Sequence, residues 1–181
     1  MNHNVNKLRI RANSLIKEGD ALENQGNYSA AELVYQQALE MQGLIFDEYY
    51  EGSILQMAEC LIKLAELAVI QEDYEKARLH IEKGCAYLDC MASITHLPSL
   101  HRKAAVAYVL WGDVADTPED AISAYEDALD HLEMPFGGHL PCFLHDKVEL
   151  FGKLAFMKSW VGDMDGYHRH FNDLLHLRSR L

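Results

Sequence analysis

The chain has 181 residues, of which 49% are hydrophobic, and 28 acidic against 16 basic side chains give it a net charge of -12. This length allows one domain with a sizeable core, and the hydrophobic content excludes a disordered chain. The negative charge disfavours nucleic acid and anionic membrane surfaces as partners, because both are themselves negatively charged. Basic or amphipathic protein segments are the better candidates.

No apolar run approaches the ~20 residues of a transmembrane helix, and the first residues lack the apolar segment of a secretory signal. We therefore expect a cytoplasmic protein whose cysteines are reduced thiols. The four cysteines form no C-x2-C pair. Cys60 and Cys85 fall inside helical patterns, which predicts that they are small core residues.

Helical periodicity extends along the whole chain, with no sustained strand alternation. The first helix starts near Val5 and ends at a turn around Gly26, which can adopt a left-handed conformation. Tyr28 to about residue 43, Glu48 to Ile70 and a stretch opened by Glu72 and Asp73 give the next three helices.

Residues 91–97 read as a linker, after which Pro98 can occupy the first turn of a fifth helix. Thr117 as N-cap and Pro118 behind it predict the start of a sixth. Residues 134–141 form the clearest loop. A seventh helix is expected from Cys142 to Trp160 and, after the turn at Gly162 and Asp163, an eighth that runs to the C-terminus.

A spacing of aromatic and small residues recurs through these helices. The copies read Tyr28-x2-Ala31-x3-Tyr35-x2-Ala38, Tyr74-x2-Ala77-x3-Ile81-x2-Gly84, Pro118-x2-Ala121-x3-Tyr125-x2-Ala128 and, in a weaker form, Met164-x2-Tyr167-x3-Phe171-x2-Leu174. The second positions of these copies lie 46, 44 and 46 residues apart. A fixed period of this size predicts a solenoid of helix pairs, each burying its apolar face on its neighbours.

This pattern resembles the tetratricopeptide repeat (TPR) family, in which a Leu-Gly pair on helix A faces alternating aromatics and alanines on helix B. The matching residues are Leu15, Gly19, Leu22, Gly26 and Tyr28 to Ala38 in the first unit, Leu61, Leu64, Ala65, Ala68 and Tyr74 to Gly84 in the second, Tyr108, Trp111, Gly112, Ala121, Tyr125 and Ala128 in the third, and Phe151, Leu154, Ala155, Gly162 and Phe171 in the fourth. The resemblance implies an all-α, right-handed solenoid of about four antiparallel helix pairs. It predicts a single domain over residues 1–181, with units at about 5–43, 48–91, 98–133 and 142–180.

Two features depart from the family pattern. The units are about ten residues longer than the usual ~34, so helices or connections must be extended. In the third unit Ala121 follows Gly112 by 9 residues, where Ala31 follows Gly19 by 12, which we interpret as a shortened turn. An ordinary irregular helical bundle remains the alternative fold.

The resemblance also implies a concave face, lined by the A helices, that takes up peptide segments. The implied groove positions are Ile16, Lys17, Asp20 and Asn24 in the first unit, Ile62, Lys63, Glu66 and Ile70 in the second, Val109, Leu110 and Asp113 in the third, and Lys153, Phe156 and Trp160 in the fourth. An apolar residue, a Lys and an acid three further on occur in both of the first two units. Such a Lys and acid can equally form a solvated i,i+3 pair with no ligand role.

TPR domains that clamp the acidic tails of heat-shock chaperones use Lys, Arg and Asn on this face. Acids stand at several of those places here, which argues against such a clamp and favours an amphipathic helix or an extended apolar peptide. We expect an adaptor or chaperone that holds a segment of a partner protein, and bacterial secretion chaperones look similar in size and charge. The alternative is a regulatory sensor, because longer units resemble those of bacterial peptide-responsive regulators.

The sequence gives little evidence for a catalytic site or a metal site. There is no G-x-S-x-G, G-x4-G-K-[ST], H-E-x2-H or G-x-G-x2-G motif, so no catalytic or cofactor-binding residue and no cofactor is predicted. The best metal-like cluster is His139, Cys142, His145 and Asp146 beside His131. Its i, i+3, i+6 spacing does not converge on one side of a helix, so we interpret these residues as loop and surface side chains.

The last helix carries further histidines and several leucines. We interpret His168, His170 and His176 as a solvated face. Ten histidines in an acidic chain allow pH-sensitive binding between pH 5 and 7. Solenoids usually end in a helix with a polar outer face, yet the last helix is rich in apolar residues, which suggests that a terminal helix packs on a second copy or a partner. The apolar residues of the last helix are Phe171, Leu174, Leu175, Leu177 and Leu181.

Overall fold

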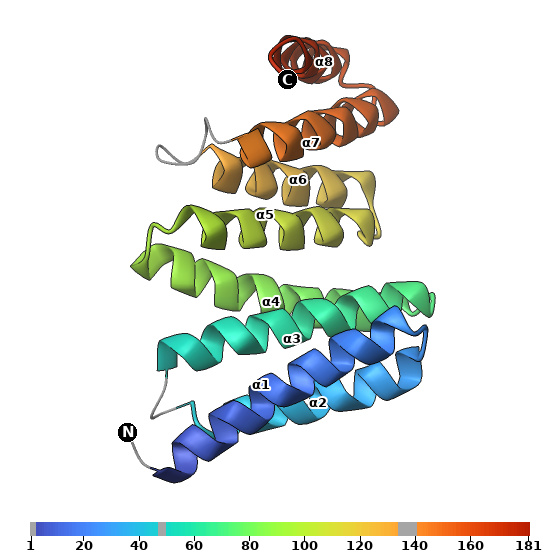
Figure 1. The fold of residues 1–181 in the computed structure, drawn as a ribbon. Helices are drawn as coiled ribbons and strands as arrows, with labels where there is room; N and C mark the ends of the chain where they lie inside the picture. Colours follow the sequence, from blue (N-terminus) through green and yellow to red (C-terminus); the bar gives the residue numbers. More distant parts are fainter. Residues whose placement is uncertain (1–2, 47–49, 134–140) are drawn as a thin grey trace. The chain divides into compact units, whose positions relative to one another are not determined.

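The computed structural model of the protein describes residues 3–46, 50–133 and 141–181 (Figure 1). Every regular element in these ranges is an α-helix, which confirms the all-α prediction. The helices are α1 (His3–Asn24), α2 (Tyr28–Leu44), α3 (Tyr50–Ile70), α4 (Tyr74–Ile94), α5 (Pro98–Asp113), α6 (Pro118–Leu132), α7 (Pro141–Trp160) and α8 (Met164–Arg178). The long α1, α3, α4 and α7 account for the extended repeat period.

The helices group into two compact units, residues 1–94 and 95–181. In the first unit α1 packs on α2, α2 on α3 and α3 on α4; in the second, α5, α6, α7 and α8 pack in the same serial way. Each unit therefore contains two antiparallel helix pairs, as the period predicts. The boundary falls inside the predicted linker, but that linker was placed too early: α4 continues to Ile94, and Met91 and Ala92 are buried in it.

Three of the helix pairs turn through the same three-residue connection. Its middle residue has a positive φ: 75° at Gly26, 61° at Glu72 and 79° at Gly162. The following amide donates to a carbonyl five residues back, as in Asn27 N to Leu22 O at 2.9 Å. Glycine adopts this conformation freely, whereas Glu72 is the one non-glycine residue with positive φ among the described residues.

The α5–α6 connection is different. Thr117 caps α6 by accepting a hydrogen bond on Oγ1 from the amide of Asp120 at 3.1 Å, and Pro118 opens the helix, both as predicted. The predicted shortening, however, does not lie in the turn, which has four residues, 114–117. It lies in α5, which ends one residue after Gly112, whereas α1 continues for five residues beyond Gly19.

The core of each unit contains the small residues of the predicted helix contacts, packed among leucines, isoleucines and aromatic side chains. Ala31 and Ala77 are fully buried and Ala121 is 3% exposed, so the paired helices approach closely at these points. Cys60 and Cys85 are buried free thiols, as predicted, and burial raises the pKa of the Cys60 thiol to about 12.

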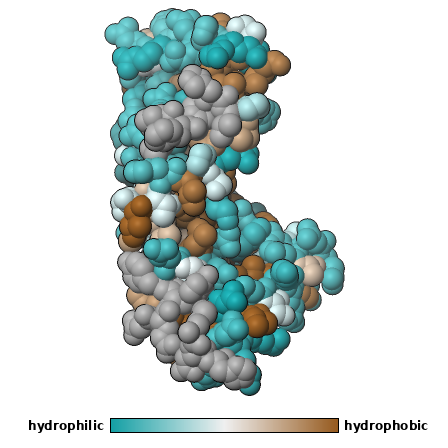
Figure 2. Space-filling view, turned by 60° about the vertical axis from the view of Figure 1, so that its left-hand side comes forward, coloured by the Kyte–Doolittle hydropathy of each residue, from teal (hydrophilic) through white to brown (hydrophobic). Residues whose placement is uncertain are grey.

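The remaining surface is largely polar. Figure 2 shows one face of the molecule on which hydrophilic residues predominate and hydrophobic residues gather in small groups. None of the described helices is both long enough and apolar enough to cross a lipid bilayer. The predicted loop at 134–140 lies outside the described residues, and Pro141, expected at its end, is instead the first residue of α7.

Candidate functional site

A buried tyrosine lies beside two carboxylates in the first unit. Tyr35 on α2 lies against Gly19 of α1, where an added Cβ would come within 2.5 Å of the tyrosine ring. Its hydroxyl donates to Asp20 Oδ1 at 2.7 Å and lies 2.9 Å from Glu23 Oε2. Burial and the two carboxylates raise the pKa of Tyr35 well above its usual value, so the hydroxyl stays protonated and remains a donor.

The second unit repeats this arrangement on α5 and α6. A Cβ on Gly112 would come within 2.3 Å of the Tyr125 ring, whose hydroxyl donates to Asp113 Oδ1 at 2.6 Å. Lys153 of α7 forms an ion pair with Asp113 and sits 5.6 Å from the centre of the Tyr125 ring. One carboxylate thus accepts from a tyrosine and pairs with a lysine, which ties α5, α6 and α7 together.

In the first unit Lys63 of α3 takes the corresponding place. It pairs with Glu23 Oε2 at 3.4 Å and with Glu66 Oε2 at 3.1 Å. Burial alone would lower the pKa of Lys63, but the two carboxylates together raise it. Tyr35 precedes Lys63 by 28 residues and Tyr125 precedes Lys153 by 28, so a Gly-Asp, Tyr, Lys motif recurs in the sequence. This spacing is visible in the sequence and would have predicted the Tyr125, Asp113 and Lys153 contacts from those of the first unit.

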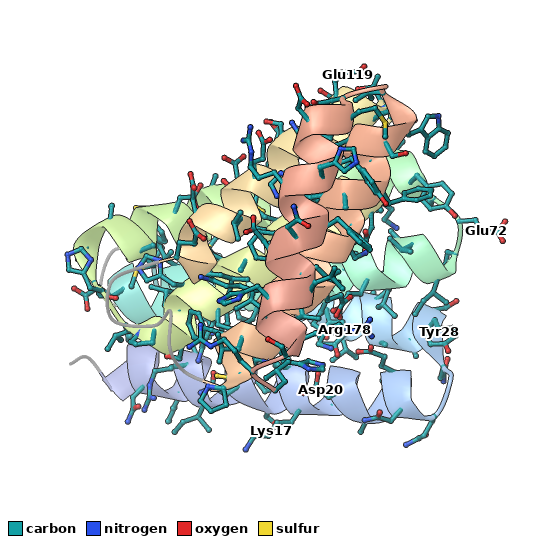
Figure 3. The ribbon with its side chains drawn as sticks, turned by 90° about the horizontal axis from the view of Figure 1, so that it is seen from above. Lys17, Asp20, Tyr28, Glu72, Glu119 and Arg178 are labelled. Carbon is teal, nitrogen blue, oxygen red and sulfur yellow. The ribbon has the colours of Figure 1, made fainter. Side chains whose placement is uncertain are left out.

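The other groove positions predicted in the first unit are engaged differently. Ile16 packs against the core formed by Leu15, Val34 and Cys60. Ile62 reaches α4, where its Cγ1 lies 3.4 Å from a Cβ placed on Gly84. Among the polar positions, Lys17 extends from α1 into solvent (Figure 3), and Asn24 is exposed at the end of α1. Of the two Lys and acid pairs, only the pair on α3 forms an ion pair among the described residues.

In the second unit a pocket opens between the two A helices. It has a volume of about 150 Å³ and takes residues from α5, α6 and α7. The lining residues are Ala105, Val106, Val109, Leu132, Asp146, Glu149 and Leu150. Leu132 and Leu150 are buried and form its floor, whereas Val106, at 50% exposed, stands on its rim. Val109 is the one predicted groove residue that lines it.

Ion pairs between α5 and α7 flank the pocket. The Arg102 guanidinium donates to Asp146 in a bidentate pair, Nε to Oδ2 at 2.6 Å and Nη2 to Oδ1 at 3.1 Å. At the other end, Lys153 pairs with Asp113. Because α5 carries Arg102 and Asp113 eleven residues apart, the pairs lie about 16 Å apart along that helix, with the apolar pocket between them. Arg102 and Val106 are not among the predicted groove positions, although their i, i+4 spacing could have indicated one shared face of α5, and Asp146 was interpreted as a surface side chain.

Two aromatic residues extend this face along α7. Phe156 and Trp160 follow Glu149 at intervals of seven and eleven residues, so the three side chains fall on one stripe of the helix. Phe156 is 63% and Trp160 68% exposed, and their rings make an edge-to-face contact at 5.8 Å. Large aromatic side chains this exposed are common at interaction surfaces.

The histidines do not form a metal centre in the described part of the chain, where no group of three or more metal-binding side chains gathers. His139, the first member of the predicted cluster, lies outside the described residues. His101 is buried, with its Nδ1 3.1 Å from Nδ1 of His131. His168 and His176 are exposed, but the prediction of a solvated face was wrong for His170, which is 8% exposed and stacks on Phe151.

Neither a family model nor a curated protein matches the sequence. Solved structures do share its fold. The crystal structure of BtubC (BKLC) from P. vanneervenii superposes with a TM-score of 0.70 over 93% of this chain, at 16% identity, and this chain spans 63% of the length of that one. The fold is TPR-like.

The de novo designed helical repeat protein DHR64 gives a TM-score of 0.50 over 98% of this chain and 94% of its own, also at 16% identity. At this level of identity the likeness concerns the fold alone. In a TPR-like fold α5 and α7 are A helices, so the pocket and the stripe of α7 lie on the face where the resemblance predicts the groove.

Proposed function

We propose that the protein is an interaction module that binds a segment of another protein on the A-helix face of its second unit. The observation that carries this proposal is the pocket between α5 and α7, with Val106 on its rim. An apolar cavity of roughly 150 Å³ is large enough for a benzene-sized group, so it accommodates one Leu, Met or Phe side chain. Exposed Phe156 and Trp160 supply further apolar contact area on the same helix.

The two units differ in what they offer a ligand. On the first, Lys63 forms ion pairs with Glu23 and Glu66, and the partly buried Ile16 packs against the core. The second unit has both the apolar pocket and the exposed aromatic pair. The proposed role of an adaptor or chaperone therefore rests on the second unit, and a peptide-responsive regulator would use the same surface.

Selection from a display library of random peptides against the pure protein tests the proposal. Enriched peptides are then measured by fluorescence anisotropy against wild type, Val106→Gln and the control Ser123→Gln, which alters an exposed position on α6. We expect Val106→Gln to weaken binding about tenfold, because it replaces an apolar rim by an amide, and Ser123→Gln to have no effect. Peptides that bind both variants equally well would place binding elsewhere and contradict the proposal.

Self-association through α8 is a separate proposal. Phe171 is 40% and Leu175 49% exposed on this helix, which packs on α7 and ends at Arg178. Sedimentation velocity of the pure protein at tens of micromolar decides it, since a strict monomer rules out a homodimer at that concentration.

A further inference from the structure

We propose that the segment bound at the α5–α7 pocket is a basic amphipathic helix, with one apolar anchor in the pocket and a Lys or Arg beside it that pairs with Glu149. This inference rests on the proposed function and adds the chemistry of the partner. It is carried by the charges around the pocket and by the spacing of apolar groups on α7.

Among the described charged residues around the pocket, one carboxylate is not matched by a cation. Arg102 is matched by Asp146, and Lys153 by Asp113. Glu149 lines the pocket and is exposed, and within the described ranges it has no hydrogen-bond or ion-pair partner. A ligand cation next to the anchor would face this carboxylate at the edge of an apolar site, where partial desolvation strengthens the attraction.

The surroundings reinforce this preference. Residues 95–181 contain 13 acidic and 8 basic side chains, so the second unit as a whole attracts cations. The cations of the two flanking pairs are already matched, Arg102 by Asp146 and Lys153 by Asp113. Both pairs join α5 to α7, so a ligand carboxylate would compete with one already in place.

The spacing along α7 indicates a helical ligand. Phe156 lies seven residues, or about 10 Å, beyond Glu149 on the same stripe. A ligand helix with apolar residues at i and i+7 spans the same rise, so that one can enter the pocket while the other contacts Phe156 and Trp160. The lysines of the ligand then lie between and beside these anchors.

Two labelled synthetic peptides of about 16 residues test the inference. Both carry the same two leucines seven positions apart, and the flanking positions are Lys in one peptide and Glu in the other. Binding is followed by fluorescence anisotropy at low and high salt. We expect the lysine peptide to bind and the glutamate peptide to bind at least tenfold more weakly. Raising the salt concentration should weaken the binding of the lysine peptide.

The variant Glu149→Gln should weaken binding of the lysine peptide about threefold to fivefold, and Glu149→Lys should weaken it further. The control Glu119→Gln removes the same charge from an exposed position on α6 and should leave binding unchanged. Glu149 is exposed, so the circular dichroism melts of its variants should match that of wild type. Glu119 lies in the first turn of α6, so its variant should melt slightly lower, which leaves the pocket unchanged.

The outcomes separate this inference from the function on which it rests. If Val106→Gln weakens binding of both peptides but Glu149→Gln changes neither, the pocket binds peptides and the basic character of the partner is refuted. If the lysine peptide binds Val106→Gln as well as wild type, the pocket itself is not the site and both proposals fail. A glutamate peptide that binds as tightly as the lysine peptide also refutes the inference.

Discussion

The two units of this chain share the Gly-Asp, Tyr, Lys motif, called the shared device below, but the residues around it differ. In each, a glycine on an A helix accommodates a tyrosine of the following helix, whose hydroxyl donates to an aspartate. In the first unit the tyrosine lies beside two carboxylates, Asp20 and Glu23, and the lysine pairs with glutamates. In the second, Asp113 alone accepts from Tyr125 and also pairs with Lys153.

The difference shows how a repeat can keep its packing and change its surface. The glycine and tyrosine positions are set by close contact inside the helix pair, so they recur. The polar partners are set by which charged residues the neighbouring helix presents. In the second unit the ion pairs lie to either side of Val106 and Val109, which leaves the apolar pocket between them.

The strongest way to break the shared device is to fill the space beneath the tyrosine. Gly19→Leu and Gly112→Leu should each destabilise the protein by about 3 kcal/mol, because the new side chain must displace a buried ring. Gly43→Leu on α2 is the matched control, since no atom lies within 4 Å of its Cβ position, and the gain in helix propensity should make it slightly stabilising. Urea unfolding measures all three, and a neutral Gly112→Leu would contradict the close packing.

Removing the hydroxyls tests the polar half of the device. Tyr35→Phe should cost about 2 kcal/mol and Tyr125→Phe about 1 kcal/mol, because each change deprives an aspartate of a hydrogen-bond donor and, among the described residues, Asp113 keeps an ion pair with Lys153 whereas Asp20 has none. Urea unfolding of both variants gives the comparison. Equal costs would mean that the pair with Lys153 does not compensate Asp113 for the lost donor.

Much of this fold could be predicted from the sequence, because helix signals and turn glycines act locally. Gly26, Thr117, Pro118 and Gly162 marked helix ends correctly, and the small residues of the period marked the helix contacts. The site could be predicted only in part. Val109 follows from the repeat pattern, but the pocket depends on Leu132 and Leu150 meeting across two other helices.

Two positions show why the rest could not be predicted. His168 and His170 are two residues apart and therefore face different sides of α8, and the sequence does not indicate which side is buried. Only the packing of α8 on α7 determines that His170 is the buried one. Ile16 is placed on the groove face by the family pattern, and that position stays a prediction. Its side chain is partly buried and packs against the core formed by Leu15, Val34 and Cys60, a contact that the pattern alone does not give.

Buried histidine should make the second unit sensitive to acid. Burial lowers the pKa of His170 below its ordinary 6.5, assisted by Lys158 and Arg169 and opposed by Asp173 and Glu126. The unfolded chain therefore takes up the proton first, so the contribution of His170 is complete above about pH 6.5 and declines as the pH falls through the folded-state pKa. His170→Phe retains the stacking on Phe151 and removes the titration.

We expect the melting temperature of His170→Phe to depend less on pH than that of wild type, with the difference growing from pH 7 to pH 5. His176→Phe, an exposed position on the same helix, is the control and should leave the wild-type pH dependence in place. A wild-type profile that is unchanged in His170→Phe would show that His170 is not the titrating group.

The smallest expected effect sharpens the comparison of the turns. Gly26 in α1–α2 and Glu72 in α3–α4 occupy the same left-handed position, with φ of 75° and 61°. An L side chain with a Cβ is strained there by roughly 1 kcal/mol. Glu72→Gly should therefore stabilise the first unit by about 0.5–1 kcal/mol, because glycine loses part of this gain through its greater freedom in the unfolded chain.

Gly26→Ala is the reverse test and should destabilise the protein by about 1 kcal/mol. Its Cβ would meet no atom within 4 Å, so the backbone conformation is the cause. Thermal denaturation resolves changes of this size. If Glu72→Gly left the stability unchanged while Gly26→Ala lowered it, contacts of the Glu72 side chain would have to offset the strain of its backbone.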